Sequence, residues 1–426
     1  MKNPSILVAH PFQQHSFQLA AALKKNNYDF KYSTTVYLKK GTVLRKMLFL
    51  LKGEAYRRAC GRRTDVLCDQ DVIVFGEIYS LGLLLIQRLP LFKAMYNWWY
   101  WKTVEHFNSK LFKYVKKNGI DIVILYDTVA RSFIQKAKAS GLSVKTIIDM
   151  SAASVGYTKS IFKNENISNA RFANPKLHNN RFSLIENKNS DYEIQQADAF
   201  FVASDFTEKS LTSQGVSKAK IFKCVYGVDD YIVADIEKET VPDSNKLICV
   251  FSGNVCMEKG AFRLFNVIDK LDLNKFEFHF FGHYSSSSSY YPLYKNKVFF
   301  HGHIIHEEFV NFLKRSDVLV FPSFADGFGL SVIEAMANEN AVICSCNAGV
   351  SEIITEDVGF VVPPSDEEGM VKHLNYLSEN RNVLEEMKIN SKKRLANMTW
   401  SNYYSQVNNA LRSIIKECND LNDERL

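Results

Sequence analysis

Short runs of apolar residues alternate with longer amphipathic stretches along most of the chain. Each run holds three to six residues rich in Val, Ile, Leu and Phe, a pattern typical of buried strands. Five strands are predicted in the first half, at residues 6–9, 72–75, 122–125, 144–148 and 199–202. Five more are predicted in the second half, at residues 247–251, 276–281, 298–300, 318–321 and 341–344. Strands that alternate with helices form parallel sheets covered by helices, so the pattern indicates an α/β protein.

A polar stretch at residues 235–245 separates the two series of strands. A chain of 426 residues is too long for a single core. We therefore predict two doubly wound, Rossmann-like domains with a cleft between them, residues 1–240 and 246–399, each binding its ligand at the carboxyl ends of its strands. Residues 400–426 contain a final amphipathic helical pattern.

Composition argues against several other classes of protein. Hydrophobic residues make up 46% of the chain, yet no window reaches about 18 uninterrupted apolar residues, so no membrane span is predicted. The N-terminus runs directly into a strand pattern without a signal-peptide core, so we expect a cytoplasmic protein. The eight cysteines show no Cys-x-x-Cys spacing and read as reduced core residues. No Gly-x-Gly-x-x-Gly follows a strand, which argues against a dehydrogenase.

The densest chemical pattern is the segment FPSFADGFGLSVIEAMA at residues 321–337. Asp326 and Glu334 stand eight positions apart around a glycine turn that opens a helix. Gly327 and Gly329 let the backbone approach a ligand, and the free N–H groups of the helix start suit a phosphate. Glu334 lies about one turn into the helix, where a carboxylate can accept hydrogen bonds from the hydroxyls of a ribose. The alternative is that Asp326 is a turn residue and Glu334 a solvated charge on the helix. The apolar neighbours of Glu334 instead favour a buried carboxylate that needs a partner.

A second cluster, residues 252–260, also follows a predicted strand and precedes a helical pattern. Lys259 at the start of that helix is electrostatically misplaced unless an anion binds beside it. A nucleotide diphosphate would supply that anion, whereas the alternative is an exposed, solvated lysine.

The two clusters together resemble the signature of glycosyltransferase family 4, also called the group 1 glycosyltransferases. The resemblance covers roughly residues 195–370, whereas the N-terminal half matches only in general pattern. It extends through residues 227–229, 341–345, 349–354 and 359–363. The resemblance implies the GT-B fold, a last helix that crosses back onto the N-terminal domain, and retaining, metal-independent transfer of a sugar from a nucleotide diphosphate.

The resemblance also implies a role for each residue of the two clusters. Lys259 would bind the diphosphate, Asp326 would face the donor sugar and Glu334 would hold the ribose. The other expected donor-binding residues are Gly253, Asn254, Arg263, Gly327, Phe328, Gly329, Leu330 and Ser331.

The chain departs from the family pattern at two of these positions. Asp326 stands in place of a glutamate and is one methylene shorter. Asn254 stands where the family has an arginine that helps to bind the diphosphate, so Arg263 is the candidate to supply that charge.

Two features that look like metal sites are interpreted otherwise. Asp69-Gln-Asp71 precedes a predicted strand, whereas the metal-binding Asp-x-Asp of the other major glycosyltransferase fold follows one, so a turn is predicted. His301, His303 and His306 cluster without a second ligand group. We expect no metal and no cofactor, and a UDP- or GDP-linked sugar as the donor substrate.

The acceptor side of the cleft is less specific. Family members often have a glycine pair after the first strand and a histidine near the donor sugar, whereas this chain has residues 10–15 and 149–151 at those places. His15 is a candidate to contact a phosphate or a sugar hydroxyl, and the alternative is a surface residue that caps a helix.

The net charge of +7 is concentrated in one segment. Residues 39–63 contain nine Lys or Arg, one Glu and seven large apolar residues. Such a basic amphipathic segment suits an anionic membrane surface, and the aromatic stretch at residues 98–101 suits a headgroup boundary. The alternatives are that the basic segment forms a solvated helix face and that the aromatic stretch belongs to the core. No nucleic acid partner is expected, because no recognised binding module accompanies the charge.

The resemblance and the charge distribution together predict a hexosyltransferase on the cytoplasmic face of a membrane, with a membrane-associated glycan or lipid-linked acceptor, in the biosynthesis of cell-surface polysaccharide or lipopolysaccharide. Two alternatives remain open. One is a non-catalytic scaffold that binds sugar nucleotides, motivated by the altered family positions. The other is a synthase that acts on a soluble sugar acceptor.

Overall fold

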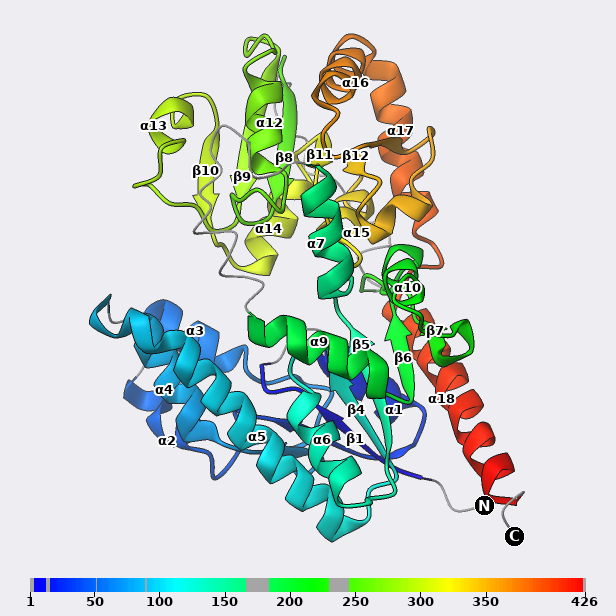
Figure 1. Cartoon of the computed structure of the whole chain (residues 1–426). Coiled ribbons are helices and arrows are strands. Elements are labelled where there is room, and N and C mark those ends of the chain that lie inside the picture. Colours follow the sequence, from blue (N-terminus) through cyan, green and yellow to red (C-terminus); the bar gives the residue numbers. More distant parts are fainter. Residues whose placement is uncertain are drawn as a thin grey trace.

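The strands fall into two separate sheets, and every strand pair is parallel (Figure 1). The first sheet has seven strands in the order β3-β2-β1-β4-β5-β6-β7, and the second has six in the order β10-β9-β8-β11-β12-β13. The prediction of an α/β chain with two doubly wound, Rossmann-like domains is confirmed. The computed structural model describes residues 4–12, 16–50, 52–88, 90–165, 184–229 and 245–423.

The bounds of the elements are as follows. The strands of the first sheet are β1 (Ser5–Ala9), β2 (Asp29–Thr34), β3 (Val72–Val74), β4 (Ile122–Tyr126), β5 (Lys145–Met150), β6 (Ala199–Val202) and β7 (Ile221–Lys223). Those of the second sheet are β8 (Leu247–Ser252), β9 (Phe276–Phe281), β10 (Phe299–Gly302), β11 (Val318–Phe321), β12 (Ala341–Ser345) and β13 (Gly359–Val362). The helices before β8 are α1 (Ser16–Lys25), α2 (Val43–Met47), α3 (Gly53–Cys60), α4 (Glu77–Arg88), α5 (Tyr96–Asn118), α6 (Arg131–Ala139), α7 (Val155–Asn164), α9 (Leu184–Gln196) and α10 (Asp205–Thr212). Those after β8 are α12 (Ala261–Ile268), α13 (Tyr291–Tyr294), α14 (His306–Leu313), α15 (Leu330–Ala337), α16 (Glu367–Glu379), α17 (Arg381–Arg394) and α18 (Trp400–Asp423). Short 3-10 helices are η1 (Leu48–Leu50), η2 (Asp69–Asp71), η3 (Pro90–Met95), η5 (Lys218–Lys220) and η6 (Gly349–Ile353).

Both faces of the first sheet are buried, which explains its continuous apolar strands. Along β1, Ile6 and Val8 belong to one core cluster, and Leu7 and Ala9 belong to another. Side chains alternate between the faces of a strand, so a strand covered on both sides is apolar at most of its positions. The same physical reason applies to β4, where all five residues are buried.

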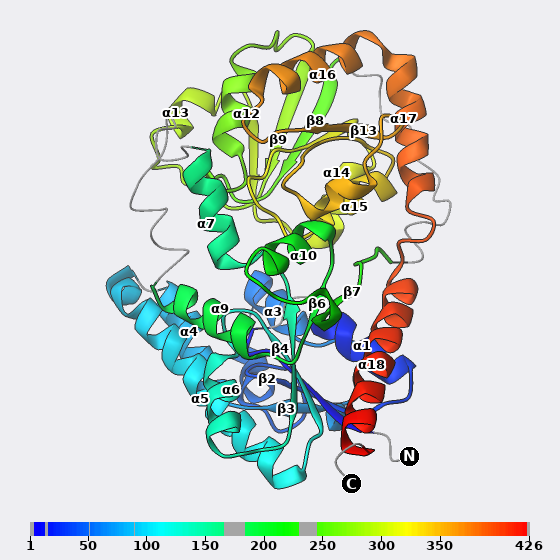
Figure 2. The same ribbon diagram turned by 45° about the vertical axis from the view of Figure 1, so that its right-hand side comes forward.

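The last helix, α18, leaves the domain of the second sheet and packs against α1 in the domain of the first (Figure 2). Tyr404 donates a hydrogen bond from its hydroxyl to Oε1 of Gln18 at 2.6 Å, and Tyr28 donates one to Oδ1 of Asn408 at 2.9 Å. The helix is therefore bound to the N-terminal domain by side-chain contacts as well as by its apolar face.

In each sheet the strand order reverses between two central strands, β1 and β4 in the first and β8 and β11 in the second. Connections on either side of such a point run to opposite faces and leave a crevice at the carboxyl ends of the two strands. His10 and Asp127 follow β1 and β4, and the loops after β8 and β11 carry Lys259 and Asp326. The fold thus creates two places suited to a ligand, one in each domain.

Three strands of the structure are absent from the predicted set. β2 has no continuous apolar run, because its buried positions include Tyr32, Ser33 and Thr34. β7 has only three residues at the edge of its sheet. β13 is also an edge strand, and its Val361 is exposed. The proposed linker at residues 235–245 and His15 lie, apart from residue 245, outside the described residues.

Candidate active site

Lys259 and Asp326, which lie 67 residues apart in sequence, form an ion pair at the carboxyl ends of β8 and β11. Their Nζ and Oδ2 atoms are 2.5 Å apart, and their side chains are 22% and 16% exposed. The pair is brought together because the two strands are neighbours, with Val318 opposite Cys249. The structure therefore joins the two sequence clusters into one candidate site.

The loop after β8 presents Lys259 across a glycine. Gly253 has a φ of +147°, and a Cβ built on it would lie 3.3 Å from Cγ of Lys259. The stem of the lysine therefore rests on the bare backbone of this residue. Asn254 accepts a hydrogen bond on Oδ1 from the backbone N–H of His283 at 3.2 Å. Asn254 is thus part of the loop but does not replace the cation that the family has there.

The loop that carries Asp326 is fixed by backbone contacts within the C-terminal domain. The N–H of Asp326 donates to the carbonyl of Asn347, and its own carbonyl accepts from Gly349, both at 3.0 Å. Oδ1 of Asp326 accepts from the N–H of Phe328 at 3.2 Å. The buried ring of Phe328 packs edge-on against Tyr226 at 5.4 Å between centroids. Phe328 therefore anchors the turn in the core.

The turn continues into α15, where Gly329 is the N-cap with a φ of +99°. Leu330 is partly buried and packs against the main core cluster, and Ser331 is half-buried in the first turn. The first N–H groups of this helix thus lie a few residues from Asp326, as the sequence pattern predicts.

Gly327 also ties this turn to the N-terminal domain. A Cβ on Gly327 would lie 2.6 Å from the carbonyl oxygen of Ser151 and 2.7 Å from Cα of Ala152, so only glycine allows this approach. The carbonyl of Gly327 accepts hydrogen bonds from the hydroxyls of Ser204 at 2.6 Å and Thr207 at 3.0 Å. Sequence reasoning missed Ser204 and Thr207, because Ser204 is the N-cap of α10 and nothing in the sequence marks its second role.

Glu334 projects from α15 and is 22% exposed, with buried Ile333 and Ala335 on either side. Its Oε1 lies 3.0 Å from Nε2 of His306, the first residue of α14. The hydrogen bond to the carboxylate raises the pKa of His306 above its usual value. The predicted need of Glu334 for a partner is thus met by a residue that the sequence offered only as one of three clustered histidines.

The other histidines of that cluster point elsewhere. Nε2 of His301 lies 2.8 Å from Nδ1 of His279, whose Nε2 contacts Oε1 of Glu277 at 2.7 Å. His303 places Nδ1 3.0 Å from the carbonyl of Ile304. Within the described residues, no three or more His, Cys, Asp or Glu side chains are grouped so that they could hold a metal ion.

Arg263 has a partner other than the candidate diphosphate site. Its Nη1 lies 3.2 Å from Oε1 of Glu367, in the first turn of α16, and Asn266 donates to the same oxygen at 2.8 Å. The side chain therefore stabilises the contact between α12 and α16. A donor-binding role for Arg263 stays a prediction, and Glu367 would compete for it.

The Asp-x-Asp sequence at residues 69–71 forms η2, directly before β3. Asp69 pairs with Arg63 at 2.7 Å, and Asp71 pairs with Lys24 at 3.0 Å. Each carboxylate thus has a cation, and the segment is a turn as predicted.

A loop of the N-terminal domain at the carboxyl end of β4 is held in a strained conformation. Thr128 has a φ of +68°, which a β-branched residue rarely adopts. Buried Glu193 accepts hydrogen bonds from the N–H groups of Thr128, Ala130 and Arg131 at 2.6, 2.7 and 2.9 Å. Burial raises the pKa of Glu193 to about 8, although these N–H groups oppose the shift.

The candidate site lies in a segment that is similar to a known family. Residues 233–394 match the family model described as glycosyl transferases group 1. The matched segment contains the whole second sheet. The match therefore covers the candidate pair and α15 but not the first sheet.

Curated relatives match the chain over a limited length. A protein described as "Uncharacterized 41.2 kDa protein in cps region" from Klebsiella pneumoniae is 29% identical over 168 residues, 38% of this chain and 46% of that protein. O-antigen chain mannosyltransferase B from Escherichia coli is 26% identical over 111 residues, 26% of this chain and 29% of that protein. The chain thus spans less than half of the length of either relative.

A solved structure matches almost the whole chain. Sucrose-phosphate synthase from Thermosynechococcus elongatus superposes with a TM-score of 0.69 at 16% identity, covering 97% of this chain and 100% of that one. At this identity the likeness is one of fold, and the fold is GT-B.

Proposed function

We propose that the protein is a retaining, metal-independent glycosyltransferase that uses a nucleotide diphosphate sugar, UDP- or GDP-linked. The observation that carries this proposal is the Lys259–Asp326 ion pair, which lies beside the start of α15 in a group 1 glycosyltransferase domain. The pair combines a cation for a diphosphate with a carboxylate for a sugar, at the kind of place where doubly wound sheets bind ligands.

In the proposed reaction, the acceptor hydroxyl oxygen forms a bond to the anomeric carbon of the donor sugar. The bond from that carbon to the diphosphate oxygen breaks, its electron pair leaves with the diphosphate, and the hydroxyl proton passes to the departing group. Negative charge grows on the diphosphate, and Lys259 with the N–H groups at the start of α15 would stabilise it. Asp326 would face the sugar, where positive charge develops on the reacting carbon.

Glu334 would bind the ribose hydroxyls of the donor. His306 already contacts this carboxylate at 3.0 Å, so a bound ribose would share Glu334 with the imidazole or displace it. A protonated His306 competes more strongly for the carboxylate than a neutral one.

We further propose that the acceptor is a membrane-associated glycan or a lipid-linked sugar, in the synthesis of cell-surface polysaccharide or lipopolysaccharide. The support is a surface at one end of the N-terminal domain, formed by α2, η1, α3, α4, η3 and the start of α5 (Figure 1). Large exposed apolar side chains lie on these elements, among them Phe49 (79%), Ile78 (72%), Leu50 (60%), Leu85 (59%) and Trp98 (55%).

Exposed basic residues lie close in sequence to Phe49 and Leu50, among them Lys40, Arg45, Lys46 and Lys52. Apolar groups bordered by cations suit an anionic lipid surface. We refer to these residues and the apolar ones named above as the basic apolar face. Among the described helices, none has the length and apolarity needed to cross a bilayer.

The proposal is tested by incubating the purified protein with a panel of UDP- and GDP-sugars. The correct donor should raise the melting temperature, since a ligand bound only to the folded state stabilises it by mass action. The protein should also slowly release nucleoside diphosphate from that donor. Stabilisation by a donor without any such release, even with acceptors added, would favour the non-catalytic scaffold.

A further inference from the structure

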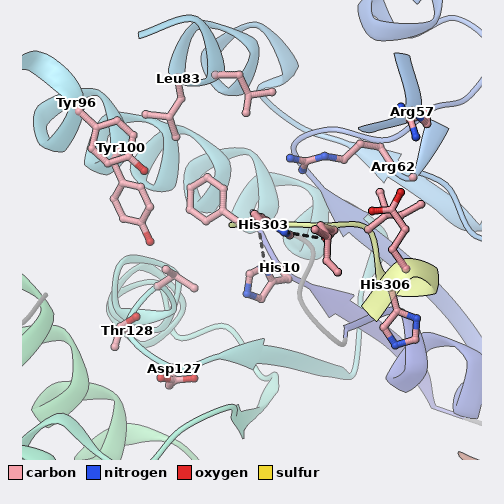
Figure 3. A pocket seen from close by; sticks show the side chains of 17 residues that line it. His10, Arg57, Arg62, Leu83, Tyr96, Tyr100, Asp127, Thr128, His303 and His306 are labelled. Atoms are coloured by element: carbon pink, nitrogen blue, oxygen red, sulfur yellow. Dashed lines mark hydrogen bonds between the residues drawn. The ribbon is translucent and has the colours of Figure 1, made fainter. Parts of the chain in front are cut away.

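A cavity of about 1000 Å³ lies between the two domains (Figure 3). The N-terminal domain lines it with the residues that follow β1 and β4 and with side chains of α3, α4 and α5. The C-terminal domain contributes residues 303–306, after β10, and the carboxylate residue Glu308 in the first turn of α14. As far as the chain is described, the lining includes neither Lys259 nor Asp326. His306 lines the cavity and contacts Glu334, so the cavity adjoins the candidate donor site.

Two arginines on one side of this cavity have no acidic partner among the described residues. Arg57 projects from α3, and Arg62 follows that helix (Figure 3). Arg62 is half-buried, and the loss of solvent lowers its pKa below the usual value. A guanidinium that is partly desolvated and unpaired is costly unless an anion completes the site. Arginine also presents the planar fork of donors that matches a phosphate.

The side of the cavity opposite these arginines is aromatic. Tyr96 and Tyr100 project from α5 with ring centroids 6.3 Å apart, and Phe12 stacks on Tyr100 at 4.9 Å (Figure 3). Binding sites for small molecules are commonly lined by aromatic faces with a few polar groups that fix orientation. Tyrosine offers an apolar ring and a hydroxyl, which suits the mixed surface of a sugar.

The floor of the cavity includes the strained loop after β4. Asp127 lines the cavity and accepts hydrogen bonds from the N–H of Ser151 at 3.2 Å and from its hydroxyl at 2.7 Å. Thr128, held at a φ of +68° by Glu193, also lines it. Strain of this kind persists where the surrounding structure enforces it, and it gathers at binding sites.

We propose that this cavity is the acceptor site and that the acceptor carries a phosphate group next to its sugar, bound by Arg57 and Arg62. The sugar would lie between the tyrosines and Asp127, with its reactive hydroxyl directed toward the donor site beyond His306. The inference rests on the proposed transferase function, because it assumes an acceptor.

Two sources could supply this chemistry, a soluble sugar phosphate or the diphosphate sugar headgroup of a polyprenyl lipid. Phe49 and Leu50 of the basic apolar face lie between α2 and α3, close in sequence to Arg57. A lipid tail on that face would therefore place its headgroup near the arginines. The two sources share the phosphate, so the arginines are needed in either case.

The test measures equilibrium binding of glucose, glucose 1-phosphate, glucose 6-phosphate, inorganic phosphate and glucose linked to farnesyl diphosphate. The wild type should bind at least one phosphorylated probe tenfold or more tightly than glucose. The double variant Arg57→Gln, Arg62→Gln should lose this preference. Preference for the glucose phosphates would identify a soluble acceptor, and preference for the farnesyl compound a lipid-linked one.

A matched control is the double variant Lys275→Gln, Lys295→Gln, which removes two exposed charges of the C-terminal domain outside both the cavity lining and the basic apolar face. It should bind every probe as the wild type does. The conservative variant Arg62→Lys, which keeps the charge but not the fork, should bind less tightly than the wild type and more tightly than Arg62→Gln. Equal binding of glucose and all phosphorylated probes, no binding of any phosphorylated probe, or unchanged binding by the double variant would overturn the proposal.

Binding of UDP and GDP to the same variants separates this proposal from the proposed function. Loss of nucleotide binding in Arg57→Gln, Arg62→Gln would assign the arginines to the donor and overturn the acceptor site. Arginine-dependent phosphate binding without release of nucleoside diphosphate from any donor would leave the cavity assignment intact and refute the transferase. Donor cleavage without arginine-dependent phosphate binding would leave the proposed transferase function intact and refute the cavity assignment.

Discussion

Lys259 and Asp326 share one short ion pair, so a bound diphosphate must share the ammonium group with a carboxylate. Replacing Asp326 by Asn removes the negative charge that would face the donor sugar. Turnover should fall by about two orders of magnitude, the scale of losing one electrostatic contact to the transition state. The affinity for nucleoside diphosphate should stay the same or rise, because repulsion between carboxylate and phosphate is lost. Steady-state release and equilibrium binding measure the two effects separately.

Asp326→Glu is the matched control, since it keeps the carboxylate and adds the methylene found in the family signature. It should retain most of the turnover of the wild type. Wild-type turnover in Asp326→Asn, or a loss of nucleotide binding without a loss of turnover at saturation, would contradict the role given to Asp326.

Glu193 makes stability depend on pH in an unusual direction. Its pKa of about 8 in the folded protein lies above the ordinary value of about 4.3 in an unfolded chain, so the folded state binds an extra proton between these values. The free energy of unfolding should therefore fall as pH rises from about 5 to 8, by up to about 1.4 kcal/mol per pH unit more than in Glu193→Gln. Urea unfolding of both proteins across this range measures the difference. If the free energy of unfolding depended on pH in the same way in both proteins, Glu193 would be ionised throughout this pH range and the prediction would be wrong.

At the scale of residues, sequence patterns pointed to Lys259, Asp326 and Glu334 as candidates because each lies in a segment where a strand is followed by a glycine turn and a helix. His306, Ser204 and Thr207 could not be found in this way. Each contacts the site from an element distant in sequence, and none has a neighbour that marks its second contact. Glu193 was equally hidden, because a carboxylate in a polar helical sequence gives no sign of burial.

At the scale of elements, the turn between β11 and α15 is the contact where the two domains meet closely. Gly327→Ala would place a Cβ 2.6 Å from the carbonyl of Ser151, so the turn or the domain interface must shift. We expect a loss of stability of roughly 1–3 kcal/mol and a larger proportional loss of turnover, because Asp326 precedes the displaced residue. Thermal unfolding and donor turnover measure the two losses.

Gly156→Ala is the control for this change. A Cβ on Gly156 would lie 3.4 Å from Oε1 of Gln214, an ordinary contact, and the residue is in helix α7. Its stability should stay the same or rise slightly. Equal effects of the two substitutions would show that the approach of Gly327 to Ser151 does not constrain the site.

The elements that sequence predicted well are the central strands, because both faces of a parallel sheet are buried and demand apolar residues. The basic segment at residues 39–63 was predicted less well. It forms α2, η1 and α3, and its cations are divided among different tasks. Lys39 donates to the carbonyls of Asp69 and Val72 at 2.7 and 2.6 Å, whereas Arg62 lines the cavity. Composition gives the net charge of the segment but not which part of the molecule each basic side chain contacts.

At the scale of the whole molecule, the basic apolar face should bind anionic vesicles. Reversal of Lys46 and Lys52 to Glu leaves the cavity lining intact and places negative charge beside Phe49 and Leu50. At about 1 kcal/mol per basic residue near a charged surface, the reversal should abolish co-sedimentation with phosphatidylglycerol vesicles at low salt. High salt should weaken binding of the wild type, because it screens the attraction.

The control for the vesicle experiment is the reversal of Lys275 and Lys295, which are exposed on the C-terminal domain. This variant should sediment with vesicles as the wild type does, and both variants should cleave the donor normally. A wild-type protein that ignores anionic vesicles at low salt would remove the membrane from the account and leave a soluble acceptor.

The arrangement of two domains around a cleft was predictable from the order of strands and helices. The cavity in that cleft was not, because its wall combines α3, α4, α5 and the loop after β10, which meet only in the folded chain. No local pattern connects Arg62 with Tyr100 or His306. A sequence therefore locates a site built within one strand–turn–helix unit far better than one built between domains.

The central claim is that Lys259 stabilises the departing diphosphate in a reaction that needs no metal. The most direct test compares release of nucleoside diphosphate from the correct donor by the wild type, Lys259→Ala and Lys295→Ala, each with EDTA. We predict that the wild type and Lys295→Ala stay active under chelation and that Lys259→Ala loses about two orders of magnitude or more in turnover. Activity that vanishes with EDTA and returns with magnesium or manganese, or a folded Lys259→Ala that turns over as fast as the wild type, would contradict the claim.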